Sequence, residues 1–183
     1  IDIGAHIGFY SLIFSKKNLR VFSFEPVLQN FEQLKKNKED NQFNKMKIFN
    51  IALSDKKKKI KMWVPDKKKT GGFSIYDEND EEIKKYNLNK IYELKSESEL
   101  GDNILNIKNE KIAIKIDVER HEKKVLNGLK KFLSSNQIIL QIEIFEQRKE
   151  NIFDQLQKMN FIHFHTIEKD YYFKNFNHFD KSI

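Results

Sequence analysis

The sequence predicts an α/β fold in which a mostly parallel sheet carries helices on both faces. Short apolar runs alternate with segments whose apolar residues recur at helical spacing along most of the 183 residues. A glycine-containing turn, Gly4 to Gly8, directly follows the first apolar run. The apolar run Lys111–Asp117 predicts a central strand buried on both faces, and Ile138–Ile144 predicts another central strand.

The first half of the chain predicts three strand and helix units in succession. Proline at position 26 favours an end to the second strand, because the residue before a proline avoids the helical region. In order, we expect a strand ending at residue 3, a helix through Ile7, Tyr10 and Phe14, a strand over 20–25, a helix through Val27, Phe31 and Leu34, a strand over 46–53, and a half-buried strand through Ile60, Met62 and Val64.

Periodicity is weak between residues 65 and 110, where a double glycine, an acidic run over 77–82 and a possible short helix near 100–105 are the main features. A connection of this length is either a functional loop or a sign that an element goes unrecognised, and Gly71, Gly72 and Ser74 would suit a flap over a bound acceptor. Order returns in the second half. It predicts a strand over 111–117, a helix over 125–133, a strand over 138–144, a helix over 152–159, and a closing pair of strands over 161–166 and 171–173.

Composition bounds the classes of protein to consider. No linker rich in proline, glycine or serine divides the chain, so we expect one domain over residues 1–183, and the start inside a strand favours a missing N-terminal segment. No stretch approaches the roughly 18 apolar residues of a membrane span. Zero cysteines exclude disulfides and thiolate zinc sites, and we expect a cytoplasmic protein.

The net charge of +7 could indicate a nucleic-acid partner. However, only Arg20, Arg120 and Arg148 are arginine, and the lysine runs at 56–59 and 67–69 lack interleaved aromatic residues. We therefore expect a solvated rim that attracts anions and no nucleic-acid partner.

The turn after the first strand predicts a nucleotide-type cofactor. Glycines let backbone N–H groups approach a ligand, and Glu25, which ends the next strand, could accept hydrogen bonds from ribose hydroxyls. A dinucleotide pattern would need glycine at His6 and Phe9, so nicotinamide and flavin dinucleotides fit poorly. Gly4 and Gly8 keep two of the three glycines of the loop that binds S-adenosylmethionine (SAM). The alternative is a tight turn that binds no ligand.

Four segments, IDIGAHIGFYSL, VFSFEP, NIALSD and IKIDVERHEKKVLNGL, together resemble the FkbM-type SAM-dependent methyltransferase family in order and spacing. The resemblance implies a Rossmann-like methyltransferase fold with a mostly parallel seven-stranded sheet and a reversed C-terminal hairpin. The sequence departs from the family's pattern at two positions. His6 replaces the usual asparagine of the cofactor loop, and Arg120 replaces a glycine, which would be strained if that position needs a positive φ.

The resemblance also implies residue roles. SAM would contact Asp2, Gly4, His6 and Gly8 near its methionine end, Glu25 at its ribose, and Ser54 and Asp55 near its adenine. For Ser54 and Asp55 a simple turn pair is an equal alternative.

The predicted catalytic residues are Asp117, at the end of the strand next to the first, and His121. His121 has the ordinary pKa best suited to a base at neutral pH, and Asp117 could orient the acceptor or accept its proton. Glu119 and Glu122 could equally be charges at a helix start. Glu143 would be costly to bury alone and so should face the same crevice. These groups could bind a divalent ion, but the sequence does not assign a metal.

The leading hypothesis is a SAM-dependent methyltransferase that acts on a hydroxyl of a glycan, a lipid-linked sugar or a secondary metabolite. An RNA or protein methyltransferase is the second hypothesis, which net charge favours and the scarcity of arginine opposes. A non-catalytic binding module that retains the fold is the third, motivated by Arg120 and the missing upstream segment.

Overall fold

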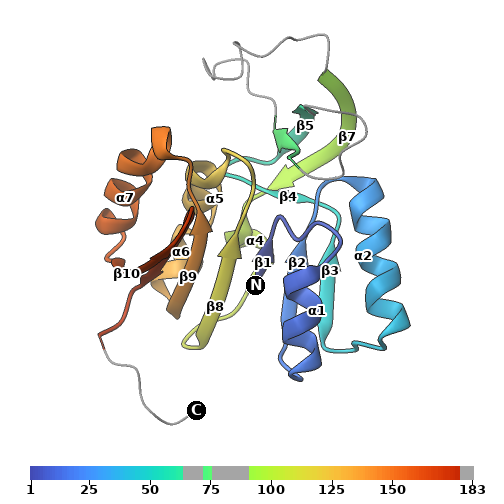
Figure 1. Cartoon of the computed structure of the whole chain (residues 1–183), viewed down its shortest axis with the longest axis horizontal. Helices are drawn as coiled ribbons and strands as arrows, with labels where there is room; N and C mark the ends of the chain where they lie inside the picture. The colour runs from blue at the N-terminus through green and yellow to red at the C-terminus, as the bar shows by residue number, and fades with distance from the viewer. Residues whose placement is uncertain (64–71, 76–90, 178–183) are drawn as a thin grey trace.

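The computed structural model describes residues 1–63, 72–75 and 91–177, and its main feature is a seven-stranded sheet in the order β10-β11-β9-β8-β1-β2-β3 (Figure 1). All neighbours pair in parallel except at one end, where β11 runs antiparallel to both β9 and β10. The predicted sheet and its reversed hairpin are thus confirmed. The strands are β1 (Asp2–Ile3), β2 (Val21–Phe24), β3 (Met46–Phe49), β8 (Lys111–Ile116), β9 (Gln137–Glu143), β10 (Ile162–Ile167) and β11 (Asp170–Lys174).

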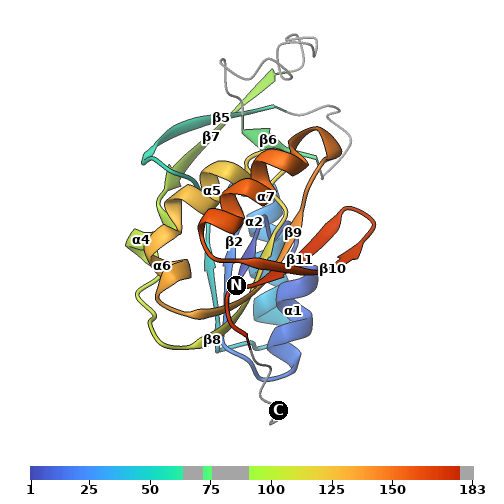
Figure 2. The same cartoon turned by 90° about the vertical axis from the view of Figure 1, so that its left-hand side faces the viewer.

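Helices cover both faces of this sheet, as Figure 2 shows. On one face, Leu34 packs with Val21 and Met46. On the other, a larger core joins alternate strand residues to the helices that follow β8 and β9. The predicted helix over 125–133 is divided in two at Leu129. The helices are α1 (Phe9–Lys16), α2 (Leu28–Asp40), α4 (Gly101–Ile104), α5 (Glu122–Gly128), α6 (Lys130–Ser134) and α7 (Lys149–Lys158), with a 3₁₀ turn at Glu146–Arg148.

The prediction that β8 is buried on both faces is wrong. Ile114 and Ile116 are buried, whereas Ala113 is exposed and Lys115 is half-buried. The reason is that α1 packs against β2, and in Figure 1 no helix of the described chain lies in front of β8. The apolar run therefore faces a core on one side only.

A second, four-stranded sheet, ordered β4-β7-β5-β6, lies above the carboxyl ends of the first (Figure 1). Its strands are β4 (Ala52–Leu53), β5 (Lys58–Trp63), β6 (Ser74–Ile75) and β7 (Ile91–Glu99). The predicted strand over 46–53 is therefore two strands in different sheets. They separate at Asn50, whose side-chain amide donates to the carbonyl oxygen of Glu25 at 2.9 Å.

Strand β7 was not predicted from the sequence. Its buried positions Ser96 and Ser98 are polar, and the Ser98 hydroxyl donates to the carbonyl oxygen of Lys56 at 2.8 Å. Because an inward row of serines has no hydropathy signal, the strand resembles a loop. Burial of Ile60 and Met62 confirms the alternating strand predicted there, while Val64, Gly71 and the acidic run at 77–82 lie outside the described residues.

No helix in the described part of the chain is both long enough and apolar enough to cross a membrane.

Candidate active site

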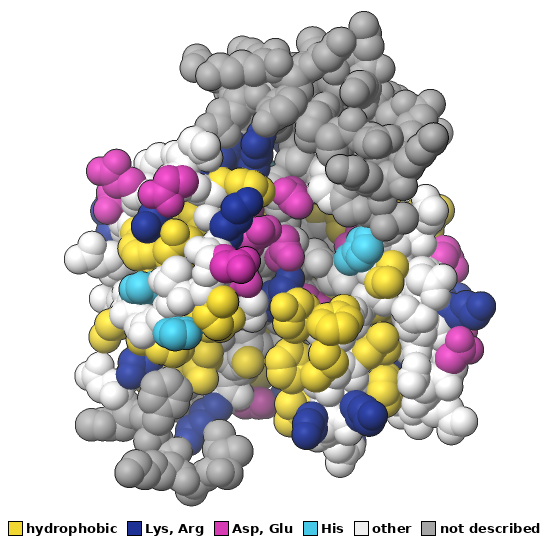
Figure 3. Space-filling view, viewed as in Figure 1, with side chains coloured by type: hydrophobic (Ala, Val, Ile, Leu, Met, Phe, Trp, Pro, Cys, Tyr) yellow, Lys and Arg dark blue, Asp and Glu magenta, His cyan; other side chains and the backbone are white. Residues whose placement is uncertain are grey.

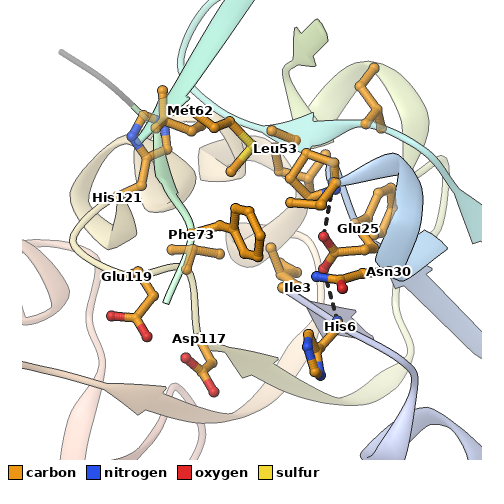
Figure 4. Close-up of a pocket in the computed structure, with 18 of the residues that line it drawn as sticks. Ile3, His6, Glu25, Asn30, Leu53, Met62, Phe73, Asp117, Glu119 and His121 are labelled. Carbon is orange, nitrogen blue, oxygen red and sulfur yellow. Dashed lines mark hydrogen bonds between the residues drawn. The ribbon is translucent and has the colours of Figure 1, made fainter. Parts of the chain in front are cut away.

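A cavity of about 260 Å³ lies where β1, β2 and β8 end, between the main sheet and the second sheet (Figure 4). Asn30 of α2 lines it, together with residues that follow the ends of three neighbouring strands: Gly4, His6, Glu25, Asp117, Glu119 and His121. Its apolar lining includes Ile51, Leu53, Met62 and Phe73. The parallel strands thus place at one edge residues that are far apart in the sequence, as expected for a ligand crevice in an open α/β sheet.

Glu25 is the most firmly held carboxylate at the cavity. It is only 4% exposed, and its two oxygens accept hydrogen bonds from the backbone N–H groups of His6 at 2.8 Å and Val27 at 2.9 Å. Burial raises the pKa of Glu25, while these bonds and one from the side chain of Asn30 act in the opposite direction. Glu25 therefore ties the glycine turn to the start of α2.

Gly4 is required because the chain after β8 passes directly over it. Its φ is +82°, and a Cβ at this position would lie 1.9 Å from the carbonyl oxygen of Asp117. Any side chain would push apart the ends of β1 and β8. Gly8, with φ +95°, faces a side-chain atom of Leu34 in the same way at 2.3 Å.

Two of the residues predicted for the methionine end of SAM, Asp2 and Gly8, do not line this cavity. Asp2 is 3% exposed, and one of its oxygens accepts a 2.6 Å hydrogen bond from the Ser11 hydroxyl, which ties β1 to α1. The other oxygen, Oδ1, is buried and has no hydrogen-bond partner among the described residues. Asp2 thus stabilises the glycine turn from outside the cavity.

Ser54 and Asp55 lie behind the apolar wall of the cavity and do not line it themselves. The Ser54 hydroxyl is 3.0 Å from Nε2 of His121 and 3.2 Å from an oxygen of Asp55. His121 lines the cavity but is only 6% exposed. Its ring therefore connects α5 to the end of β4, and its predicted role as a base stays a prediction.

Asp117 lies at the opposite side of Gly4 from Glu25, where acidic side chains gather at the tips of β8 and β9 (Figure 3). Its side chain is 37% exposed and forms a 2.8 Å ion pair with Lys115, which lies two residues earlier on the same face of β8. Burial, together with the negative charge of Asp117, raises the pKa of Glu143 to about 7. Burial and Asp117 also raise the pKa of Glu119.

The backbone after Asp117 is left-handed at two consecutive residues, with φ 48° at Glu119 and 75° at Arg120. The position at which the resemblance expects glycine thus does need a positive φ. Arg120 is held there by its own N–H, which donates to Glu122 at 2.8 Å, and by its carbonyl oxygen, which accepts from Arg148. These contacts offset the strain of an arginine in this conformation.

One potential ligand set for a metal exists among the described residues. Carboxylate oxygens of Asp117, Glu119 and Glu143 lie within 4.8 Å of one another, and such oxygens suit a divalent cation. His121, which the sequence placed in the same group, is not part of this set.

Sequence reasoning missed Asn30, Lys115, Met62 and Phe73 at this site. Lys115 could have been found, because a residue two positions before Asp117 on a strand shares its face. The others come from elements that approach the cavity only through tertiary packing.

Comparison with known proteins gives a family and a fold for this chain. The family model of the methyltransferase FkbM domain matches residues 2–173. A crystal structure of methyltransferase FkbM from Methylobacillus flagellatus KT is similar, with a TM-score of 0.58 and 18% identity over 94% of this chain and 42% of that chain. A crystal structure of precorrin-6y C5,15-methyltransferase from Geobacter metallireducens GS-15 has a TM-score of 0.50 and 12% identity, covering 94% of this chain and 75% of that one.

These two similarities show the fold alone, and this chain spans less than half of the length of the first of the two proteins. No curated protein gave a significant match. The family match, by contrast, covers nearly all of the chain, including the glycine turn, Glu25 and Asp117. The protein therefore belongs to the FkbM methyltransferase domain family.

Proposed function

We propose that this protein is a SAM-dependent methyltransferase that methylates a hydroxyl group of a glycan, a lipid-linked sugar or a secondary metabolite. One observation carries the proposal: Glu25 is fixed by backbone N–H groups at one side of Gly4, and Asp117 lies at the other side, both lining one cavity. The proposal includes a single methyltransferase domain over residues 1–183.

The chemistry of the cavity suits an adenosine group. An ionised carboxylate can accept about four hydrogen bonds, so Glu25, which already accepts from two backbone N–H groups and from the side chain of Asn30, can accept one more from a ribose hydroxyl. Ile51, Leu53 and Met62 provide apolar walls nearby, which suit the faces of a purine. SAM, when bound, supplies a methyl group made electrophilic by its sulfonium.

The residues at the tips of β8 and β9 would prepare the acceptor. Asp117 can accept the proton of a hydroxyl, and the ion pair with Lys115 fixes the direction of its carboxylate. Alignment of the two reacting groups accounts for much of the rate enhancement in such a transfer. His6 also lines this cavity, beside Glu25 in Figure 4, and would contact the cofactor there.

Calorimetry with S-adenosylhomocysteine tests the cofactor. The wild-type protein should bind it, and Glu25→Ala should weaken binding roughly a hundredfold, because hydrogen bonds to a charged group are worth about 1.5–3 kcal/mol each. Glu32→Ala is the matched control, since Glu32 is exposed on α2 and carries the same charge. Wild-type protein that does not bind would refute the proposal.

The acceptor class needs a separate experiment. Candidate glycans, lipid-linked sugars and secondary metabolites are incubated with SAM labelled at its methyl group, and label should appear on an acceptor oxygen. Label found instead on RNA or on a protein would favour the alternative acceptors.

A further inference from the structure

A short strap, defined here as Gly72–Ile75, lies against the cavity although it belongs to the second sheet. Its β6 residues pair with β5, Ser74 opposite Trp63 and Ile75 opposite Met62. Ser74 and Ile75 are only 5% and 7% exposed. The strap is therefore packed into the molecule.

Phe73 contributes an aromatic side chain to the cavity. It lines the cavity together with Leu53 and Met62, and Figure 4 shows it between Ile3 and Met62 near the centre of the view. The volume of about 260 Å³ is slightly below the 300–1,000 Å³ typical of small-molecule sites. A cofactor that enters must therefore contact this ring.

Ser74 connects the strap to the acceptor side of the site. Its hydroxyl donates a 2.5 Å hydrogen bond to the carbonyl oxygen of Glu119, the first of the two left-handed residues. Asp117 lies two residues earlier. Because a left-handed turn of this kind persists only when surrounding contacts hold it, the Ser74 bond helps to fix the backbone that follows Asp117.

We propose that the strap is a positioning element that links the two sides of the site: Phe73 packs against the bound cofactor, and Ser74 holds the backbone of Glu119. The first half of the inference rests on the function proposed above. The second half concerns the protein alone, so the two can fail separately.

Binding of S-adenosylhomocysteine tests Phe73. Phe73→Ala should weaken binding about tenfold through loss of an aromatic contact, with Phe73→Leu in between as a variant that retains bulk. Phe9→Ala is the control, since Phe9 is 66% exposed on α1.

Unchanged or tighter binding by both Phe73 variants would overturn the first half, because Phe73 would then be neutral or an obstruction. If the wild-type protein itself does not bind, the proposed function fails.

Hydrogen exchange without any ligand tests Ser74. Ser74→Ala should speed exchange of the Arg120 amide, which donates to Glu122 in the held turn, about tenfold, while Ser74→Thr, which keeps the hydroxyl, should stay near the wild-type rate. The affinity of Ser74→Ala for S-adenosylhomocysteine should stay within about twofold of wild type, since its hydroxyl is used by Glu119. Equal exchange in Ser74→Ala and wild type would overturn the second half.

Discussion

The carboxylates on the two sides of the cavity lie in contrasting environments. On the side of β2, both oxygens of Glu25 accept hydrogen bonds from backbone N–H groups. On the side of β8 and β9, Asp117, Glu119 and Glu143 crowd one another, and burial and mutual repulsion raise the pKa of the last two.

Under the proposed function, the two sides would have different roles, cofactor binding and proton transfer. A carboxylate that backbone N–H groups hold at both oxygens is preorganised, which suits the binding of a ligand in one orientation. Glu143, whose pKa is raised to about 7 by burial and by Asp117, can gain or lose a proton near neutral pH, which suits acid and base chemistry. Left-handed backbone occurs on both sides: at Glu119 and Arg120 after β8, and at His6, with φ 52°, after β1.

The largest effect is expected where the two sides meet. Gly4→Ala should lower the free energy of unfolding by about 4 kcal/mol, because the new Cβ meets the backbone oxygen of Asp117 and the φ is positive. Thermal unfolding should shift by roughly 10 °C. Gly8→Ala is the matched control. It has the same φ strain, but it meets the end of a leucine side chain that can move, so about half the effect is expected. Equal losses would remove the close approach of β1 and β8 as a cause.

The pH dependence of stability at Glu122 tests whether burial raises carboxyl pKa values near the β8 side. Burial raises the pKa of this 1% exposed carboxyl from 4.5 to about 7, although the N–H of Arg120 donates to it. Since the folded state holds the proton more tightly, stability should fall as pH rises from about 4.5 through 7, by about 3 kcal/mol. Glu122→Gln should abolish this part of the loss in denaturant unfolding at pH 5 and pH 8. Glu32→Gln, on an exposed position, should leave the pH dependence unchanged.

Asp117→Asn separates binding from turnover. The asparagine keeps the size of the side chain but cannot take a proton, so methyl transfer to a hydroxyl acceptor should fall roughly a hundredfold. The affinity for S-adenosylhomocysteine should stay within about threefold, since the cofactor is assigned to Glu25. Steady-state rates and calorimetry measure the two. Wild-type turnover by the variant would remove Asp117 from the mechanism and with it the contrast between the sides.

The smallest expected effect concerns Arg120. Arg120→Gly should leave the protein about 1 kcal/mol more stable than Arg120→Ala, because φ is 75° at this position. At Lys35, which is exposed within α2, the order should reverse: Lys35→Ala should be about 1 kcal/mol more stable than Lys35→Gly, because alanine favours a helix. Denaturant unfolding of the four variants shows whether the order reverses. The same order at both positions would argue against a left-handed turn at Arg120.

Much of the fold was predictable because its signals are local. Apolar runs at β2, β8 and β9 and helical spacing in α1, α2 and α7 identified the main sheet and its helices. Strand β7 was missed because serines fill its inward positions, and the run over 46–53 was taken as one strand because hydropathy does not record a change of sheet. The burial of β8 was overestimated for a related reason: its apolar composition does not say which face a helix covers.

By itself, the sequence determined which strands end in Gly4, Glu25 and Asp117, since parallel strands bring their carboxyl ends to one edge. Only the tertiary structure decided that Asp2 and Ser54 fix the site from outside the cavity, and that Phe73 and Ser74 reach the site from a second sheet. The physical reason is that strand order follows from local pattern, whereas the direction and partner of each side chain depend on elements that are distant in sequence and meet only when the core packs.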